Sequence, residues 1–216
     1  MRAATTFAVA VILLAAGVAV PFAQHTRLFK PEDLSELEGP DRDEWQQPGK
    51  IMDVLGIGDS SVVADLGAGS GWFTIRLANR VGPNGLVFAE DIQRPMIQAI
   101  KVRVDRLGLK NVATVLGTAT DPHLPAPVDA VLIVDAYHEM EHPVALLTNL
   151  AKSLKPTARI GIVDFTKDGG GPGPAMEERV DPEAVIRDAQ AAGLVMRSRE
   201  TFLKYQYMLV FEKPGS

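Results

Sequence analysis

Short apolar runs alternate with amphipathic stretches from residue 48 to the end of the chain. Five of the runs are rich in β-branched residues and are bounded by turn residues, which is typical of buried strands. They cover residues 62–66, 86–90, 112–116, 130–134 and 159–164. Strands that alternate with helices indicate a parallel sheet covered by helices.

Three helices are predicted from apolar residues spaced three and four positions apart. The third also has clear end signals, with Asp181 as N-cap, Pro182 at the first helical position and Gly193 after the last turn. The predicted core-facing residues are Ile97, Ile100, Val104 and Leu107, then Leu146, Leu147, Leu150 and Leu154, then Val185, Ile186 and Ala189.

The last two apolar runs, residues 196–202 and 206–212, are joined by a few residues and predict an antiparallel hairpin. The Gly- and Pro-rich residues 168–174 predict a mobile loop after the fifth strand, where a lid could close. The predicted fold is therefore α/β: a mostly parallel seven-stranded sheet with a C-terminal antiparallel hairpin and helices on both faces. We assign it to one domain, residues 48–216.

The N-terminal residues differ from the rest in composition. Residues 1–23 hold one charged side chain, Arg2, followed by an apolar run, which is typical of a signal peptide or a membrane anchor. We expect the protein to be exported or anchored through this segment, and a cytoplasmic location stays open. Residues 24–47 are polar, acidic and interrupted by prolines, and they predict a linker that Trp45 docks onto the domain.

Charge and composition narrow the class of partner. The formal net charge is -5, and the Lys and Arg residues are scattered, so the basic patch of a nucleic-acid-binding protein is missing. The chain has no cysteine, which excludes disulfides, thiolate catalysis and Cys-rich zinc sites. A small-molecule partner fits these features best, and the oligomeric state stays open.

A glycine-rich turn follows the first strand, with the sequence Asp65-Leu66-Gly67-Ala68-Gly69-Ser70-Gly71. Bare glycines and the amides of a helix start let a nucleotide approach the main chain closely. The dinucleotide fingerprint requires a third glycine where this chain has Trp72, which disfavours a nicotinamide-dependent oxidoreductase. Asp91, directly after the second strand, is predicted to accept hydrogen bonds from ribose hydroxyls.

From Trp45 to Lys213 the chain resembles the class I S-adenosylmethionine (SAM) dependent methyltransferases, within the branch that includes the ubiquinone/menaquinone C-methyltransferases. The family's first motif matches residues 63–71, its ribose acid matches Asp91, and its fourth-strand motif matches Asp135. The resemblance implies a Rossmann-like fold with SAM as cofactor. The implied cofactor-binding residues are Asp65, Gly67, Ala68, Gly69, Gly71, Asp91, Ile92, Thr118, Ala119 and Asp135.

The chain departs from the family at three points. Many relatives carry an acidic residue where this chain has Thr118, which puts in question whether that side chain recognises the adenine amino group. Thr157-Ala158 replaces a Gly-Gly turn away from the site. The absence of cysteine excludes the branch that methylates arsenic.

The fourth strand runs into a titratable cluster at its carboxyl end, where ligands of open α/β sheets bind. We expect His138 to deprotonate an acceptor, Glu139 to assist it, and Tyr137 to stack on the acceptor or the cofactor. The alternative is that these residues form only a solvent-exposed helix start without a chemical role. No metal is expected, because Pro143 leaves His138 and His142 outside a regular helix.

These observations favour a SAM-dependent methyltransferase that transfers a methyl group to a small-molecule acceptor by in-line displacement. The alternative is a SAM-binding scaffold of the same fold without turnover. The cluster after the fourth strand distinguishes the enzyme from the scaffold, since a scaffold has no need for polar groups beside the methyl group of SAM. The sequence leaves open whether carbon, oxygen, nitrogen or sulfur accepts the methyl.

Overall fold

The computed structural model describes residues 28–30, 38–168 and 170–215. Its centre is a seven-stranded sheet in the order β3-β2-β1-β4-β5-β7-β6. The strands are β1 (Val62–Leu66), β2 (Leu86–Asp91), β3 (Val112–Leu116), β4 (Val128–Val134), β5 (Leu154–Phe165), β6 (Val195–Glu200) and β7 (Gln206–Glu212). The helices are α1 (Arg42–Gln46), α2 (Pro48–Val54), α3 (Trp72–Val81), α4 (Arg94–Arg106), the 3-10 turn η2 (Tyr137–Glu139), α5 (Pro143–Lys152) and α6 (Pro182–Ala191).

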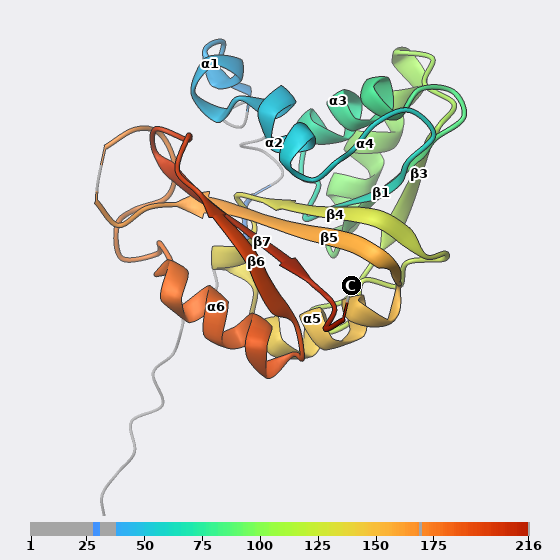
Figure 1. Cartoon of the computed structure of the whole chain (residues 1–216). Coiled ribbons are helices and arrows are strands. Elements are labelled where there is room, and N and C mark those ends of the chain that lie inside the picture. The colour runs from blue at the N-terminus through green and yellow to red at the C-terminus, as the bar shows by residue number, and fades with distance from the viewer. Residues whose placement is uncertain (1–27, 31–37, 169, 216) are drawn as a thin grey trace, which may run out of the picture.

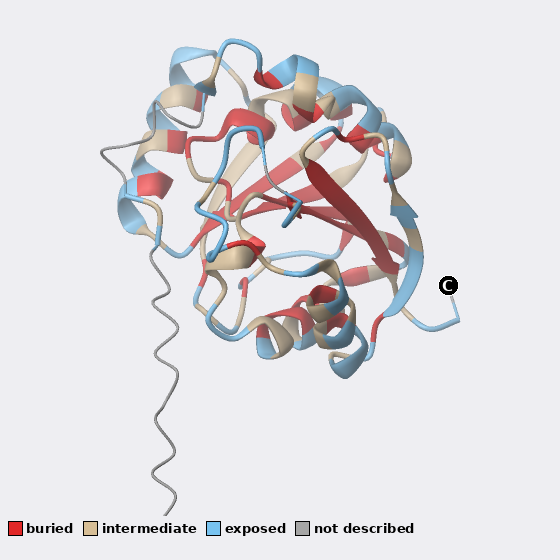
Figure 2. Cartoon of the chain, turned by 90° about the vertical axis from the view of Figure 1, so that its left-hand side faces the viewer, coloured by how far each residue is buried: buried red, intermediate tan, exposed pale blue. Residues whose placement is uncertain are grey.

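Strands β1 to β5 are parallel, whereas β7 runs antiparallel to both β5 and β6. Helices α2, α3 and α4 cover one face of the sheet, and α5 and α6 cover the other (Figure 1). The central strands are buried on both faces and the edge strand β6 is largely exposed (Figure 2). The predicted α/β fold with its C-terminal hairpin is confirmed.

Several boundaries differ from the prediction for physical reasons. Leu154 is buried as expected, but it begins β5 and pairs with Val128 instead of ending a helix. Leu107 is 51% exposed, because α4 ends at Arg106 and Gly108 turns the chain away with φ of 68°. The first strand of the hairpin stops at Glu200, where its pairing with β7 ends.

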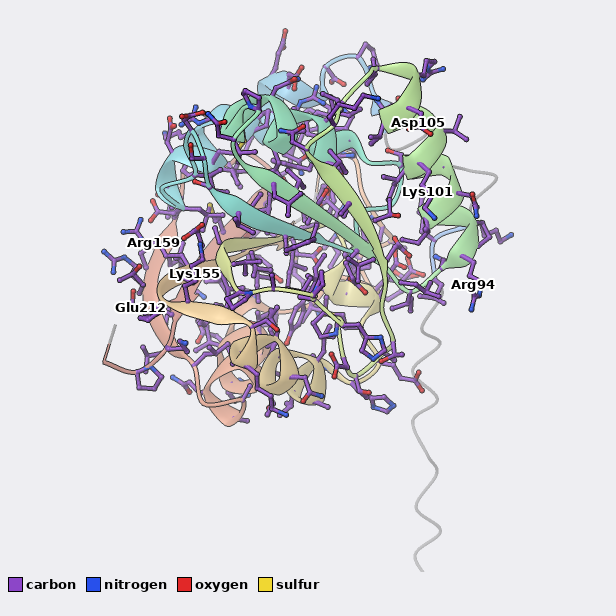
Figure 3. All side chains as sticks on the ribbon, turned by 90° about the vertical axis from the view of Figure 1, so that its right-hand side faces the viewer. Arg94, Lys101, Asp105, Lys155, Arg159 and Glu212 are labelled. Atoms are coloured by element: carbon purple, nitrogen blue, oxygen red, sulfur yellow. The ribbon has the colours of Figure 1, made fainter. Side chains whose placement is uncertain are left out.

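The end signals of the last predicted helix are confirmed in α6. The side chain of Asp181 accepts a hydrogen bond from the amide of Glu183 at 2.8 Å, as an N-cap residue does. On α4, in contrast, the charged residues Arg94, Lys101 and Asp105 lie on the outer face, away from the sheet (Figure 3). The charged face toward solvent and the apolar face toward the sheet fix how α4 packs.

The C-terminal part of the segment predicted to be a linker belongs to the folded body. It forms α1, in which Gln46 is fully buried and Arg42 is 8% exposed. The ring of Trp45 lies 6.0 Å from that of Phe165 and 6.2 Å from that of Tyr205, so this residue docks the segment as expected. The first 23 residues, predicted to be a signal peptide or anchor, lie outside the described residues. Among the described residues, no helix is long and apolar enough to cross a bilayer.

The described residues of the Gly-rich loop are held by protein contacts. Arg179, 6% exposed, donates hydrogen bonds to the carbonyls of Pro174 and Thr166, each at 3.0 Å. A side chain at Gly173 would overlap the ring of Phe165, since its Cβ would lie 2.7 Å away. Residues 170–173 of the loop are nevertheless exposed, and the mobility and lid role of the loop stay predictions.

Candidate functional site

The glycine turn after β1 forms the base of the site. Gly67, Gly69 and Gly71 have φ values of 67°, 53° and 78°, a left-handed conformation that favours glycine. A Cβ at Gly67 would lie 2.6 Å from the Cβ of Ala136, so only glycine fits between β1 and β4. The turn leads directly into α3, which begins at Trp72 with Gly71 as its N-cap.

Asp91 at the end of β2 faces this turn. Its carboxylate accepts hydrogen bonds from the amide of Gly69 at 3.0 Å and from the amide of Gln93 at 2.8 Å. Burial raises the pKa of Asp91, and these amides act in the opposite direction by stabilising the charged form. The side chain therefore connects the glycine turn to the start of α4.

A partly enclosed cavity of about 190 Å³ opens above the glycine turn and Asp91. It brings together residues from β1, β2, the loop after β3 and the end of β4, as the carboxyl edge of a parallel sheet does. The predicted cofactor residues that line it are Asp65, Gly67, Ala68, Gly69, Asp91, Ile92, Thr118, Ala119 and Asp135. Gly71 lies behind the wall, where a Cβ would touch Ile100 at 3.4 Å.

Asp65 is a buried acid at the base of the cavity. Burial raises its pKa to about 6, and the hydroxyl of Thr74 donates a hydrogen bond to it at 2.6 Å, which favours the charged form. Thr74 lies on α3 and is fully buried, so the position of the Asp65 carboxyl is fixed from inside the protein.

Asp135 adopts a left-handed φ of 54° directly after β4. Its carboxylate accepts hydrogen bonds from Arg42 and Gln46 of α1, each at 3.0 Å, and from Gln206 of β7. Burial raises its pKa to about 6, while the charge of Arg42 opposes this shift. The guanidinium of Arg42 also lies 4.3 Å from the ring centroid of Trp72, so α1 covers the cavity through one arginine.

The titratable cluster after β4 contains a histidine and a buried aspartate. The Nδ1 atom of His138 lies 3.0 Å from Oδ1 of Asp164, and the amide of His138 donates to the same carboxylate. Asp164 is fully buried near the end of β5. Burial alone would lower the pKa of His138, but the hydrogen bond and charge of Asp164, with a contribution from Glu139, raise it to about 8.

Of the two neighbours His138 and Glu139, only Glu139 lines the cavity. Its Oε1 lies 3.8 Å from Nε2 of His138, and its Oε2 accepts a hydrogen bond from the amide of Phe29 at 2.8 Å. The carbonyl of Phe29 accepts in turn from the side chain of Gln93 at 3.0 Å. The backbone of Phe29 thus bridges the two sides of the cavity.

Tyr137 faces the opposite way. Its side chain is 3% exposed in the core beneath the sheet, and its hydroxyl donates to Asp188 of α6 at 2.8 Å. It is absent from the cavity wall, so its ring is not placed to stack on an acceptor or a cofactor there. The reason is local, since the η2 turn directs Glu139 toward the cavity and Tyr137 toward α6.

Thr118 lines the cavity, but its hydroxyl is used within its own loop. It accepts a hydrogen bond from the amide of Asp121 at 3.0 Å and donates to the carbonyl of the same residue at 3.2 Å. Among the described residues, no three His, Asp or Glu side chains gather in a way that could hold a metal ion.

Sequence reasoning missed Asp164, Arg42, Gln46 and Phe29. Asp164 had a signal, because it is an acid at the carboxyl end of a parallel strand, as are Asp91 and Asp135. The other three come from the polar segment before the domain, where no motif marks them. Their side chains and main chain reach the site only through tertiary packing.

Comparison with known proteins identifies related chains. Residues 63–157 match the family described as "Methyltransferase domain". Nocamycin O-methyltransferase from Saccharothrix syringae is 30% identical over 130 residues, which are 60% of this chain and 45% of that protein. The ubiquinone/menaquinone biosynthesis C-methyltransferase UbiE from Cupriavidus pinatubonensis is 30% identical over 108 residues, 49% of this chain and 43% of that one. The chain thus spans less than half the length of these two relatives.

Solved structures agree over a larger share of the chain. A SAM-dependent methyltransferase from Aquifex aeolicus is 29% identical, with a TM-score of 0.80 over 85% of this chain and 98% of that one. The [4+2]-cyclase SpnF, 15% identical, shares the fold with a TM-score of 0.66 over 79% of this chain and 82% of that one. By its fold, its motifs and these matches, the chain is similar to the class I SAM-dependent methyltransferases, and residues 63–157 match their methyltransferase domain.

Proposed function

We propose that the protein binds SAM and transfers its methyl group to a small-molecule acceptor by in-line displacement. One observation carries the proposal: the glycine turn and Asp91 are hydrogen-bonded to each other at a cavity whose lining also includes Glu139. The cavity thus combines the features of a nucleotide site with a further titratable group. A non-catalytic binding protein needs only the first.

The residues of the chain suit the parts of SAM. The turn at Gly67 and Gly69, with Asp65 beside it, would hold the methionine portion, and Asp91 would accept the ribose hydroxyls. Ile92 and Ala119 would flank the adenine. When bound, SAM supplies a methyl group on a sulfonium, a leaving group that needs no protonation, so the main task of the protein is to place the acceptor.

We propose that Glu139 and His138 take up the acceptor proton. Asp164 holds Nδ1 of His138, which leaves Nε2 as the basic nitrogen, 3.8 Å from Glu139. Glu139 would contact the acceptor, and His138 would take the proton from it, while Asp164 orients the ring. This assignment places His138 behind Glu139 on the acceptor side.

The chemical class of the acceptor is also a proposal. Leu28, Phe29, Trp72 and Phe73 give much of the remaining wall an apolar character, which favours an apolar acceptor. The names of the relatives cover both an O-methyltransferase and a C-methyltransferase, so the acceptor atom stays open. We further propose export or membrane association through residues 1–23, which amino-terminal sequencing of protein from the native host would test.

The decisive experiment is a calorimetric titration of the full chain with SAM, with S-adenosylhomocysteine (SAH) and with NAD. SAM and SAH should bind and NAD should not. Methyl-transfer assays on lipid-extract and quinone-like acceptors then follow. SAM binding without turnover on any acceptor would favour the scaffold, and a folded protein that fails to bind SAM would refute the proposal.

A further inference from the structure

Glu90 is a buried acid beside the cavity whose hydrogen-bonding capacity is not used. It is 3% exposed, and its Oε2 accepts only a long hydrogen bond of 3.4 Å from the amide of Gly67. Within the described part of the chain, its Oε1 is covered by protein atoms and has no hydrogen-bond partner. Buried polar groups in folded proteins nearly always have hydrogen-bond partners, so an unpaired carboxyl oxygen beside a ligand cavity suggests that the ligand supplies the partner.

The position of Glu90 places it at the nucleobase end of the cavity. It precedes Asp91 on β2 and pairs with Val115 of β3, and its side chain lines the same cavity as Ile92. Its carboxyl lies against Gly117, directly before Thr118, and a Cβ at position 117 would overlap Oε1. The bare glycine therefore leaves space for this carboxyl to turn.

Thr118 is poorly placed to recognise the base. Many relatives of the family carry an acid at this position, whereas the Thr118 hydroxyl is engaged with both main-chain groups of Asp121. The chain thus lacks an acid at position 118 of the loop after β3, and it has an unpaired one, Glu90, on the neighbouring strand β2.

We propose that Glu90 recognises the adenine of bound SAM, by pairing with its 6-amino group and the adjacent ring nitrogen. The inference rests on the proposed function, in which SAM is the ligand. The amino-bearing edge of adenine presents one donor and one acceptor, and a neutral carboxylic acid offers the complementary acceptor and donor. No strong hydrogen bond holds the terminal carboxyl, so its rotation toward the base would break none.

The protonation state fits this role. Burial, and then the charge of the adjacent Asp91, raise the pKa of Glu90 to about 8, so the acid is mostly neutral at pH 7. A neutral acid keeps its donor and does not add a third negative charge beside Asp65 and Asp91.

The test compares SAH with its analogue whose purine carries hydrogen in place of the 6-amino group. Both are titrated by calorimetry into the full-length protein and into Glu90→Leu, Glu90→Gln and Glu141→Gln. The wild-type protein should bind SAH about tenfold more tightly than the analogue, the usual effect of one lost hydrogen bond at a site built for it. Glu90→Leu should reduce this preference to within about twofold, and Glu90→Gln should keep most of it, because an amide also has a donor and an acceptor.

Glu141→Gln is the matched control, since Glu141 lines the same cavity with an exposed side chain and should leave the ratio unchanged. Glu90→Leu should also fold normally, because it replaces an unpaired buried acid by an apolar side chain of similar size, and thermal unfolding checks this. Equal affinity of the wild-type protein for both ligands, or a tenfold preference that persists in Glu90→Leu, would overturn the inference while leaving SAM binding intact. Absence of SAH binding by the wild-type protein would instead refute the proposed function and the inference together.

Discussion

Asp91 is the residue on which the nucleotide assignment can be tested most directly. Asp91→Ala should weaken SAM binding by about 1–3 kcal/mol, because the ribose hydroxyls lose their acceptor. Calorimetric titration measures the change, and Asp105→Ala on the outer face of α4 is the control with a similar loss of charge (Figure 3). Unchanged affinity in Asp91→Ala would move the ribose contact to another residue.

His138 provides a second test at the scale of the residue. His138→Ala should leave SAM affinity within about twofold, since the side chain does not line the cavity, and should lower turnover on the order of 10²-fold if the acceptor must lose a proton. His142→Ala removes a neighbouring exposed imidazole and should have no such effect. A loss of SAM affinity in His138→Ala would assign the residue to the cofactor side.

The pH dependence follows from the environment of the same imidazole. Asp164, Glu139 and Asp135 face it, and together they raise its pKa to about 8 against the effect of burial. Below that pH the ring is protonated and cannot accept a proton, so kcat/KM should fall as the pH drops through about 8. Profiles from pH 6 to 9 should show this limb in the wild-type protein and lack it in His138→Gln. An identical limb in both would assign the titration to another group.

Individual residues also show which parts of the site could be predicted from the sequence and which could not. Asp91 and the glycines could be placed from the sequence, because their spacing after β1 and β2 is fixed by the fold. Tyr137, His138 and Glu139 are consecutive in sequence, and tertiary packing decides that only Glu139 lines the cavity. The hydroxyl of Tyr137 pairs with Asp188, 51 residues away, and no local pattern encodes that contact.

At the scale of the element, the parallel strands were predictable and α1 was not. Buried parallel strands are continuous apolar runs, which stand out in the sequence. Helix α1 has only five residues, and its buried side chains Arg42 and Gln46 are polar. Their burial is compensated by Asp135 and Gln206, residues that lie far along the chain.

Helix α1 should depend on the ion pair between Arg42 and Asp135. Arg42→Ala should destabilise the protein by roughly 3 kcal/mol, the lower end for breaking a buried pair, because Gln46 and Gln206 still donate to Asp135. Urea denaturation measures the change, and Arg94→Ala at an exposed position is the control (Figure 3). Equal stability of the two variants would mean that Gln46 and Trp45 hold α1 without the ion pair.

At the scale of the whole molecule, the first residues should be dispensable for folding. Every described strand and helix lies after residue 41, so a chain that starts at His25 should be soluble and bind SAM as the full chain does. Chromatography and calorimetric titration check the two properties. Aggregation of the shortened chain would mean that residues 1–23 pack on the domain, against their assignment as a signal peptide or anchor.

The bridge made by Phe29 has a consequence for the kinetics of the molecule. Both of its hydrogen bonds, to Gln93 and to Glu139, use main-chain atoms, so they do not depend on which side chain stands at position 29. The amide of Phe29 occupies Oε2 of Glu139, and a substrate that displaced this amide would free that oxygen. Admission of a substrate and exposure of the proton acceptor would then be a single event.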